Sequence, residues 1–196
     1  LWPKQPLGMS IIGTNESINR LNREEISIFK KQYYVPSNIV ISAAGLLEHN
    51  KFTNRIRNIF SSLKSKDVSP FLKVKEEQYR PQSKLLYKDT EQTHLVLGFH
   101  SLRRDHPLRY ALWLLHIILG ANMSSRLFNE LREKRGLAYE IGTQVKHFQD
   151  TGAFIVHAGI DNRKVNESVE LILKELEKAK DKLVSIDEFK RAKEFY

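Results

Sequence analysis

Histidines are the first candidates for chemistry in this sequence, because seven of them occur in a chain of 196 residues that contains no cysteine. Two histidines three or four residues apart on a helix can converge on zinc. None of the seven has that spacing, and neither His-x-x-Glu-His nor His-Glu-x-x-His occurs. We therefore expect no metal site built wholly from this chain, and we interpret the histidines as strand and surface residues. They are His49, His94, His100, His106, His116, His147 and His157.

Other catalytic signatures are also missing. The lack of cysteine excludes thiolate zinc sites, iron–sulfur clusters, disulfides and cysteine nucleophiles. No Gly-x-Ser-x-Gly nucleophile elbow, Walker A loop or dinucleotide-binding glycine pattern occurs. Composition and spacing alone therefore name no reaction.

The net charge is +9, from 32 Lys and Arg against 23 Asp and Glu, and such a balance attracts anionic partners. The charges alternate in sign along predicted helices, as in residues 174–182, and no run of Lys and Arg forms a basic arm. We expect solvated helix faces and no nucleic-acid partner.

The sequence contains no evident membrane or export segment. No apolar run approaches the ~20 residues of a membrane span, and residues 1–10 lack the basic and apolar regions of a signal peptide. Together with the absence of cysteine, this predicts a cytoplasmic protein, or a mitochondrial-matrix protein in a eukaryote.

The elements that could position functional side chains begin with a helix over residues 22–34, where Asn22 and Glu25 can form a capping box. Residues 38–44 predict a buried strand, and residues 48–63 predict an amphipathic helix. Residues 61–88 show no sustained period, which indicates a linker along the surface.

The second half alternates strands with helices. Ser124 or Ser125 can cap one of these helices, and Ser185 with Glu188 can form a second capping box. One helix is apolar on nearly every face and should be buried on most sides. The predicted strands are 93–99, 138–148 and 153–160, and the predicted helices are 108–119 (the apolar one), about 125–135, about 163–180 and a last one from Ser185.

These patterns predict an α+β fold. Segments 39–63 and 154–180 each join a similar strand to a helix, which indicates a duplicated unit. The first strand-like residues have no evident partner and the last helix begins without finishing. We therefore expect the chain to be an interior piece of a longer protein.

Residues 118–141, ILGANMSSRLFNELREKRGLAYEI, resemble a recognisable stretch of the non-zinc half of pitrilysin/insulinase-type inverted zincins, in particular the small bacterial and mitochondrial processing peptidases. Strings at 5–18, 33–45, 91–99 and 151–160 support the resemblance and follow the family's order. The resemblance implies two homologous α+β units in tandem. Each has an antiparallel or mixed sheet with helices packed on one face, and the first is truncated here.

The resemblance also implies what this segment lacks. The family's His-x-x-Glu-His motif and its third zinc ligand lie upstream of the string at 5–18. The full-length protein would therefore bind zinc outside this segment, and the segment alone would be inactive. By analogy, residues 1–63 are the C-terminal part of the zinc-bearing domain, residues 64–88 are a linker, and residues 89–196 are the second homologous domain, truncated at its end.

Arg132 and Tyr139 match an Arg/Tyr pair that the family swings over its zinc site to hold the scissile peptide. A guanidinium and a phenol can donate hydrogen bonds to a substrate carbonyl or to the oxyanion that develops from it. The resemblance therefore implies that both residues bind substrate. Without it, they read as a solvated helix residue and an ordinary strand aromatic.

Gly120, Asn122 and Ser124 lie in a segment that matches a family loop proposed to guide substrate. The family loop is richer in glycine, and Ala121 and Asn122 replace glycines here. An ordinary turn between helices is the alternative interpretation.

Two functions follow from the resemblance. In the first, the full-length protein is a zinc-dependent endopeptidase acting on peptides or unfolded proteins, as a homodimer or with a paired homologous subunit. In the second, it is a catalytically silent homologue that serves as a partner or scaffold subunit. The intact Arg132 and Tyr139 favour the first.

Overall fold

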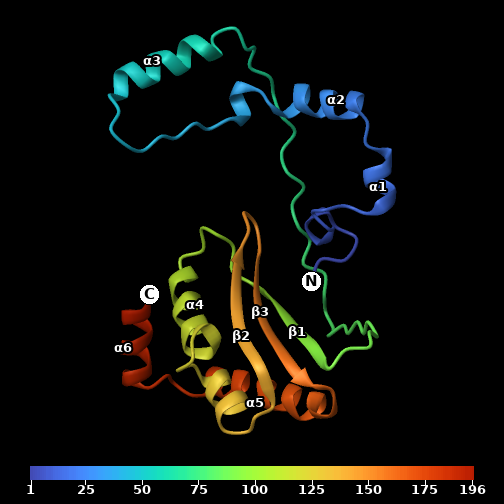
Figure 1. Ribbon diagram of the computed structural model, residues 1–196. Helices are drawn as coiled ribbons and strands as arrows, with labels where there is room; N and C mark the ends of the chain where they lie inside the picture. Colours follow the sequence, from blue (N-terminus) through green and yellow to red (C-terminus); the bar gives the residue numbers. More distant parts are fainter. The chain divides into compact units, whose positions relative to one another are not determined.

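The computed structural model describes residues 1–196, which form two compact units (Figure 1). One unit comprises Lys4–Lys73, and the other comprises Leu1–Pro3 together with Val74–Tyr196. The division into domains at 1–63, 64–88 and 89–196 stays a prediction.

The Lys4–Lys73 unit is helical. The capping box predicted for Asn22 and Glu25 is confirmed. The Asn22 side chain accepts a hydrogen bond from the Glu25 amide at 3.0 Å, and the Glu25 side chain accepts one from the Asn22 amide. The helices are α1 (Asn15–Arg20), α2 (Arg23–Tyr33) and α3 (His49–Phe60), with 3-10 turns at Pro6–Gly8 (η1) and Pro36–Asn38 (η2).

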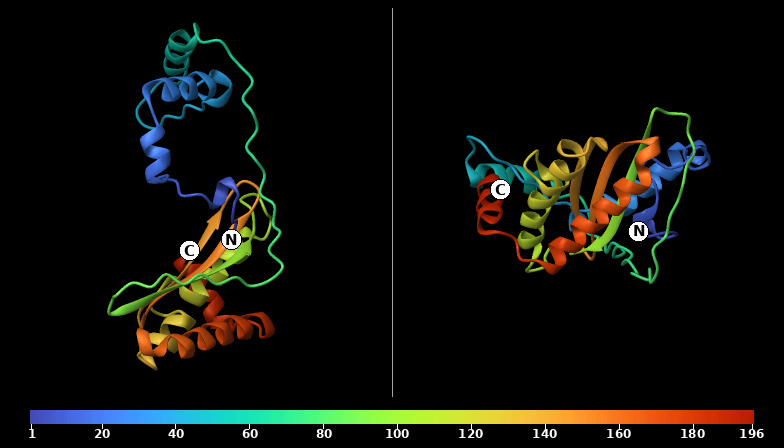
Figure 2. Two further views of the ribbon diagram at one scale, coloured as in Figure 1. Left: turned by 90° about the vertical axis from the view of Figure 1, so that its right-hand side faces the viewer. Right: turned by 90° about the horizontal axis from the view of Figure 1, so that it is seen from below.

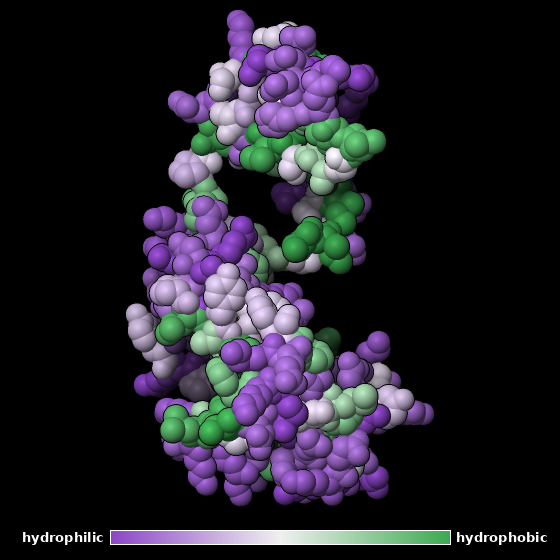
Figure 3. All heavy atoms as spheres, turned by 90° about the vertical axis from the view of Figure 1, so that its left-hand side faces the viewer, coloured by the Kyte–Doolittle hydropathy of each residue, from purple (hydrophilic) through white to green (hydrophobic).

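The strand predicted at 38–44 is wrong. Ile39 has extended backbone angles, yet no neighbouring strand pairs with this segment, and Val40 is fully exposed. Extended residues become a strand only when another strand takes up their backbone hydrogen bonds. Apolar side chains remain at the surface of this unit (Figure 3). They include Ile26 and Phe29 on α2.

The second unit is built on a three-stranded antiparallel sheet in the order β1-β3-β2. Its strands are β1 (Gln92–Ser101), β2 (Ala138–His147) and β3 (Gly152–Asp161), within two residues of the predicted bounds. The hairpin between β2 and β3 is closed by the Phe148 amide, which donates to the Thr151 carbonyl at 2.9 Å. The predicted α+β class is confirmed.

Helices cover one face of this sheet (Figure 2). The first is α4 (Arg109–His116), which continues into the π-helical turn η3 (Ile117–Ala121). The second contains the π-helical segment η4 (Phe128–Glu133). The third is α5 (Val165–Asp181), which follows the 3-10 turn η5 (Asn162–Lys164). The strand residues facing them are Leu95, Leu97, Ile141, Val145, Phe154, Val156, Ala158 and Ile160, and the helices contribute Leu112, Leu115, Leu119, Leu127, Leu131 and Ile172.

The burial predicted for the apolar helix 108–119 is correct only for its last three residues. Ile117–Gly120 are buried, whereas α4 contains no fully buried residue and Tyr110 is 53% exposed. The end of the helix is buried because η3 packs against both β2 and α6 (Ile186–Phe195), where Ile117 and Ile118 meet Ala192. No helix combines the length and apolar character required to cross a bilayer.

An ion pair between Arg126 and Glu188 ties α6 to the helix that precedes β2. Arg126 Nε and Nη2 donate to the two carboxylate oxygens of Glu188 at 2.7 and 2.9 Å, and both side chains are about four-fifths buried. The predicted capping box of Ser185 and Glu188 is also confirmed. The Arg126 guanidinium, with the hydroxyl and amide of Ser185, lowers the pKa of Glu188 from 4.5 to about 2.

We expect Glu188→Gln to lower the free energy of unfolding by about 1–2 kcal/mol at neutral pH, because a charge-assisted bidentate pair becomes a neutral contact. A carboxyl whose pKa is lowered by folding contributes stability that is present above 4.5 and lost as the pH falls toward 2. The wild-type chain should therefore lose more stability than the variant between about pH 5 and about pH 3. Urea denaturation at both pH values measures this, with the exposed Glu177→Gln as control. Equal losses in wild type and Glu188→Gln would refute the assignment.

Candidate functional site

Arg132 lies on the helix that runs into β2, beside residues that fix its backbone. Leu127 and Leu131 on the same helix are fully buried, so the helix is held against the sheet while the next residue, Arg132, stays exposed. Each buried leucine contributes roughly 1.5–3 kcal/mol by leaving water.

The chain reverses immediately after Arg132. Gly136 adopts a left-handed conformation with φ of 57°, which glycine reaches without the steric cost of a side chain. Its amide donates to the Arg132 carbonyl at 3.1 Å, and the Leu137 amide donates to the Leu131 carbonyl at 2.8 Å. The turn thus connects Arg132 directly to the first residues of β2.

Tyr139 occupies a β-bulge at the start of β2. Ala138 pairs with Ile160 and Glu140 pairs with Gly159, so Tyr139 is the extra residue between two consecutive rungs. A bulge redirects the side chain that it carries. The Tyr139 side chain is 74% exposed and its hydroxyl makes no hydrogen bond within the chain.

The structure brings Arg132 and Tyr139 together. The guanidinium carbon of Arg132 lies 5.4 Å from the centroid of the Tyr139 ring, within the range of a cation–π contact. The same carbon lies 5.0 Å from the centroid of the Phe128 ring. Two hydrogen-bond donors, a guanidinium and a phenol, are therefore exposed side by side, and their role in substrate binding stays a prediction.

Phe128 was not among the candidate site residues predicted from the sequence. In the structure Phe128 is half-buried, with contacts to the core and to Arg132. Its position four residues before Arg132 on one helix was the available signal, because residues i and i+4 are neighbours on a helix surface.

Glu130, two residues before Arg132, is paired with other cations. Lys134 Nζ and Arg135 Nη1 each lie 2.5 Å from a carboxylate oxygen of Glu130. Lys134, followed by Arg135, lowers the pKa of Glu130. Glu130 thus stays ionised without engaging Arg132, which forms no salt bridge.

The three residues predicted to guide substrate, Gly120, Asn122 and Ser124, lie in different surroundings. Gly120 is buried in η3, where an added Cβ would lie 2.8 Å from the Thr143 amide nitrogen. Asn122 Oδ1 accepts a hydrogen bond from the Ser124 amide at 2.9 Å, and Ser124 is exposed. Packing therefore explains Gly120 and a turn explains Asn122, while substrate guidance by this segment stays a prediction.

The cap predicted at Ser124 or Ser125 is wrong. Neither hydroxyl accepts a hydrogen bond from the helix, and the Ser125 hydroxyl is buried without a partner. The Asn122 side chain instead accepts from the Ser124 amide in the turn before this helix.

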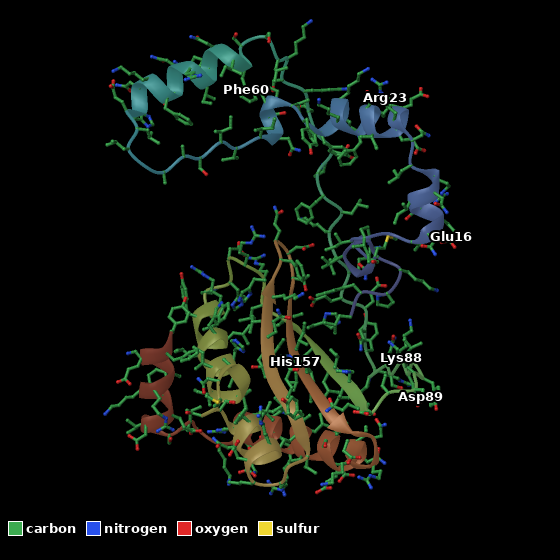
Figure 4. All side chains as sticks on the ribbon, in the orientation of Figure 1. Glu16, Arg23, Phe60, Lys88, Asp89 and His157 are labelled. Carbon is green, nitrogen blue, oxygen red and sulfur yellow. The ribbon has the colours of Figure 1, made fainter.

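The histidines form no metal site. Four lie on strands, as expected, and His116 on α4 instead contacts Thr143, with Nδ1 2.6 Å from Thr143 Oγ1. Burial lowers the pKa of His116. On the face of the sheet away from the helices, His157 Nε2 lies 3.9 Å from Glu140 Oε1 (Figure 4). Among residues 1–196 no three His, Cys, Asp or Glu side chains are grouped to hold a metal ion, so the residues present do not fit zinc.

Comparison with known proteins shows the family to which this chain belongs. A family model described as the peptidase M16 inactive domain matches residues 20–196. A protein of Streptomyces coelicolor, named an uncharacterized zinc protease, is 34% identical over 192 residues, which are 95% of this chain and 42% of that protein. A Rickettsia felis protein of the same description is 36% identical over 197 residues, covering 98% of this chain and 46% of the relative.

The solved structures include a similar fold. The crystal structure of a protease from Helicobacter pylori matches with a TM-score of 0.84 at 27% identity, covering 93% of this chain and 45% of that one. The chain thus spans less than half the length of the proteins that it matches.

Proposed function

Because this chain belongs to the peptidase M16 inactive-domain family, we propose that it is the substrate-holding part of a zinc-dependent endopeptidase. The resemblance of residues 118–141 to the non-zinc half of pitrilysin/insulinase-type inverted zincins supports the same proposal. The observation that carries the proposal is the exposed contact of Arg132 with Tyr139, whose polar ends have no partner within the chain.

In this proposal Arg132 and Tyr139 act as hydrogen-bond donors to one carbonyl oxygen of an extended peptide. Their bonds strengthen as negative charge develops on that oxygen during attack by water. The buried Leu131 and Ala138 hold the two backbones in place, so little reorganisation is required when substrate arrives.

The zinc of the full-length protein is assigned to residues outside this segment. The names of the Streptomyces and Rickettsia relatives support a zinc protease, and the donor groups described above provide no site for the metal. A peptide or unfolded-protein substrate, a homodimer or paired homologous subunit, and a cytoplasmic or mitochondrial-matrix location stay predictions.

We expect the isolated 196-residue chain to bind no zinc at micromolar concentration and to cleave no peptide. Three protein ligands and an open position are the usual requirement of a catalytic zinc site. The complete protein should cleave a quenched fluorogenic peptide, and a chelator should abolish that cleavage. Calorimetry with zinc and fluorimetry with and without chelator provide the measurements.

The outcomes separate the two functions. Chelator-sensitive cleavage by the isolated chain would show that a zinc site lies within residues 1–196, contrary to the proposal. A folded, zinc-loaded complete protein that cleaves none of a diverse peptide library would instead favour the catalytically silent partner or scaffold subunit.

A further inference from the structure

Arg132 differs from the other arginine near the end of its helix. The Arg135 guanidinium is occupied by Glu130, through its carboxylate at 2.5 Å and its backbone carbonyl at 2.9 Å. The Arg132 guanidinium has instead two aromatic rings beside it, Phe128 at 5.0 Å and Tyr139 at 5.4 Å.

Contact through aromatic rings leaves the donors of an arginine free. A guanidinium is planar and its five N–H groups point outward in that plane, whereas an aromatic ring attracts the cation without accepting those hydrogen bonds. A carboxylate partner would occupy two of the donors. The two rings can therefore restrain Arg132 while its hydrogen-bonding edge remains available.

The two rings are not equivalent. Tyr139 is 74% exposed on a bulge, so core packing restrains its ring little. Phe128 is half-buried and packs against the core cluster that includes Leu127 and Leu131. It also begins the π-helical segment η4, and such segments frequently occur at functional sites. Phe128 is thus the ring whose position is set by the fold.

We propose that Phe128 is a positioning residue, whose ring orders the Arg132 guanidinium so that its free edge meets the substrate carbonyl. This inference rests on the proposed substrate-holding role of Arg132. An ordered arginine loses less side-chain entropy on binding than a mobile one.

The test uses the complete protein and a quenched peptide. Phe128→Leu keeps an apolar side chain against the core but removes the ring, and we expect kcat/KM to fall about threefold to fivefold, the range of an exposed cation–π contact. Phe128→Trp restores an aromatic face and should return kcat/KM to within about twofold of wild type. Thermal melts of each variant report any change in folding.

A double-mutant cycle separates positioning from a purely structural role. If Phe128 acts through Arg132, Phe128→Leu should have no further effect on kcat/KM in a protein that already carries Arg132→Gln. An undiminished loss in that background, or no loss from Phe128→Leu alone, would overturn the inference. If Arg132→Gln itself leaves kcat/KM unchanged, the proposed function fails as well, so the two failures are distinguishable.

Discussion

Tyr139→Phe is expected to lower kcat/KM of the complete protein about 100-fold or more, with no change in its melting temperature. Loss of one donor to a developing oxyanion typically costs ~2.7–4 kcal/mol in the transition state. The substitution removes only a hydroxyl that makes no hydrogen bond within the chain, and it keeps the ring beside Arg132. Stability should therefore be preserved.

Steady-state cleavage of a quenched peptide, paired with thermal melts, measures this effect. Tyr87→Phe serves as the matched control, because Tyr87 is 87% exposed and lies in a segment without regular structure. A Tyr139→Phe variant within about threefold of wild type has lost less than ~0.7 kcal/mol. That result would remove Tyr139 from the substrate site and leave it an ordinary strand aromatic.

Gly120→Ala is expected to destabilise the chain by about 3 kcal/mol, in the upper part of the range for overpacking. An added Cβ would lie 2.6 to 2.8 Å from the methyl, amide nitrogen and hydroxyl of Thr143. Since the amide belongs to β2, the clash cannot be relieved by rotating a side chain alone. Either η3 or the strand must shift, which would also disturb the contact between His116 and Thr143.

Chemical denaturation of the 196-residue chain measures this change. Gly98→Ala is the control, because its Cβ would meet only the flexible Leu1 side chain at 3.3 Å or more. We expect Gly98→Ala to change stability by less than about 0.5 kcal/mol. A Gly120→Ala variant as stable as Gly98→Ala would show that η3 does not pack against β2 as closely as described.

Local patterns in the sequence predicted local structure well. The capping boxes at Asn22 and Ser185 depend on residues within four positions of one another, and both form. The segment 38–44 has the composition of a strand, but a strand also depends on a distant partner that no local pattern supplies.

The remaining features depend on long-range contacts. The sheet order β1-β3-β2 and the pair of Arg126 with Glu188, 62 residues apart, involve segments that are distant in sequence. The candidate site was found in part. A family resemblance pointed to Arg132 and Tyr139, and the i, i+4 spacing on one helix could have pointed to Phe128. The bulge at Tyr139 became evident only in the structure, because it depends on the pairing of β2 with β3.

The bulge makes Tyr139 independent of the hydrogen-bond ladder that holds the sheet. Ala138 and Glu140 keep successive pairing with β3 whichever side chain stands between them. Selection on binding chemistry at this position is thus separated from selection on folding. A descendant of this chain could therefore exchange the tyrosine and retain its sheet. Under the proposed substrate-holding role, binding would be lost without loss of the architecture.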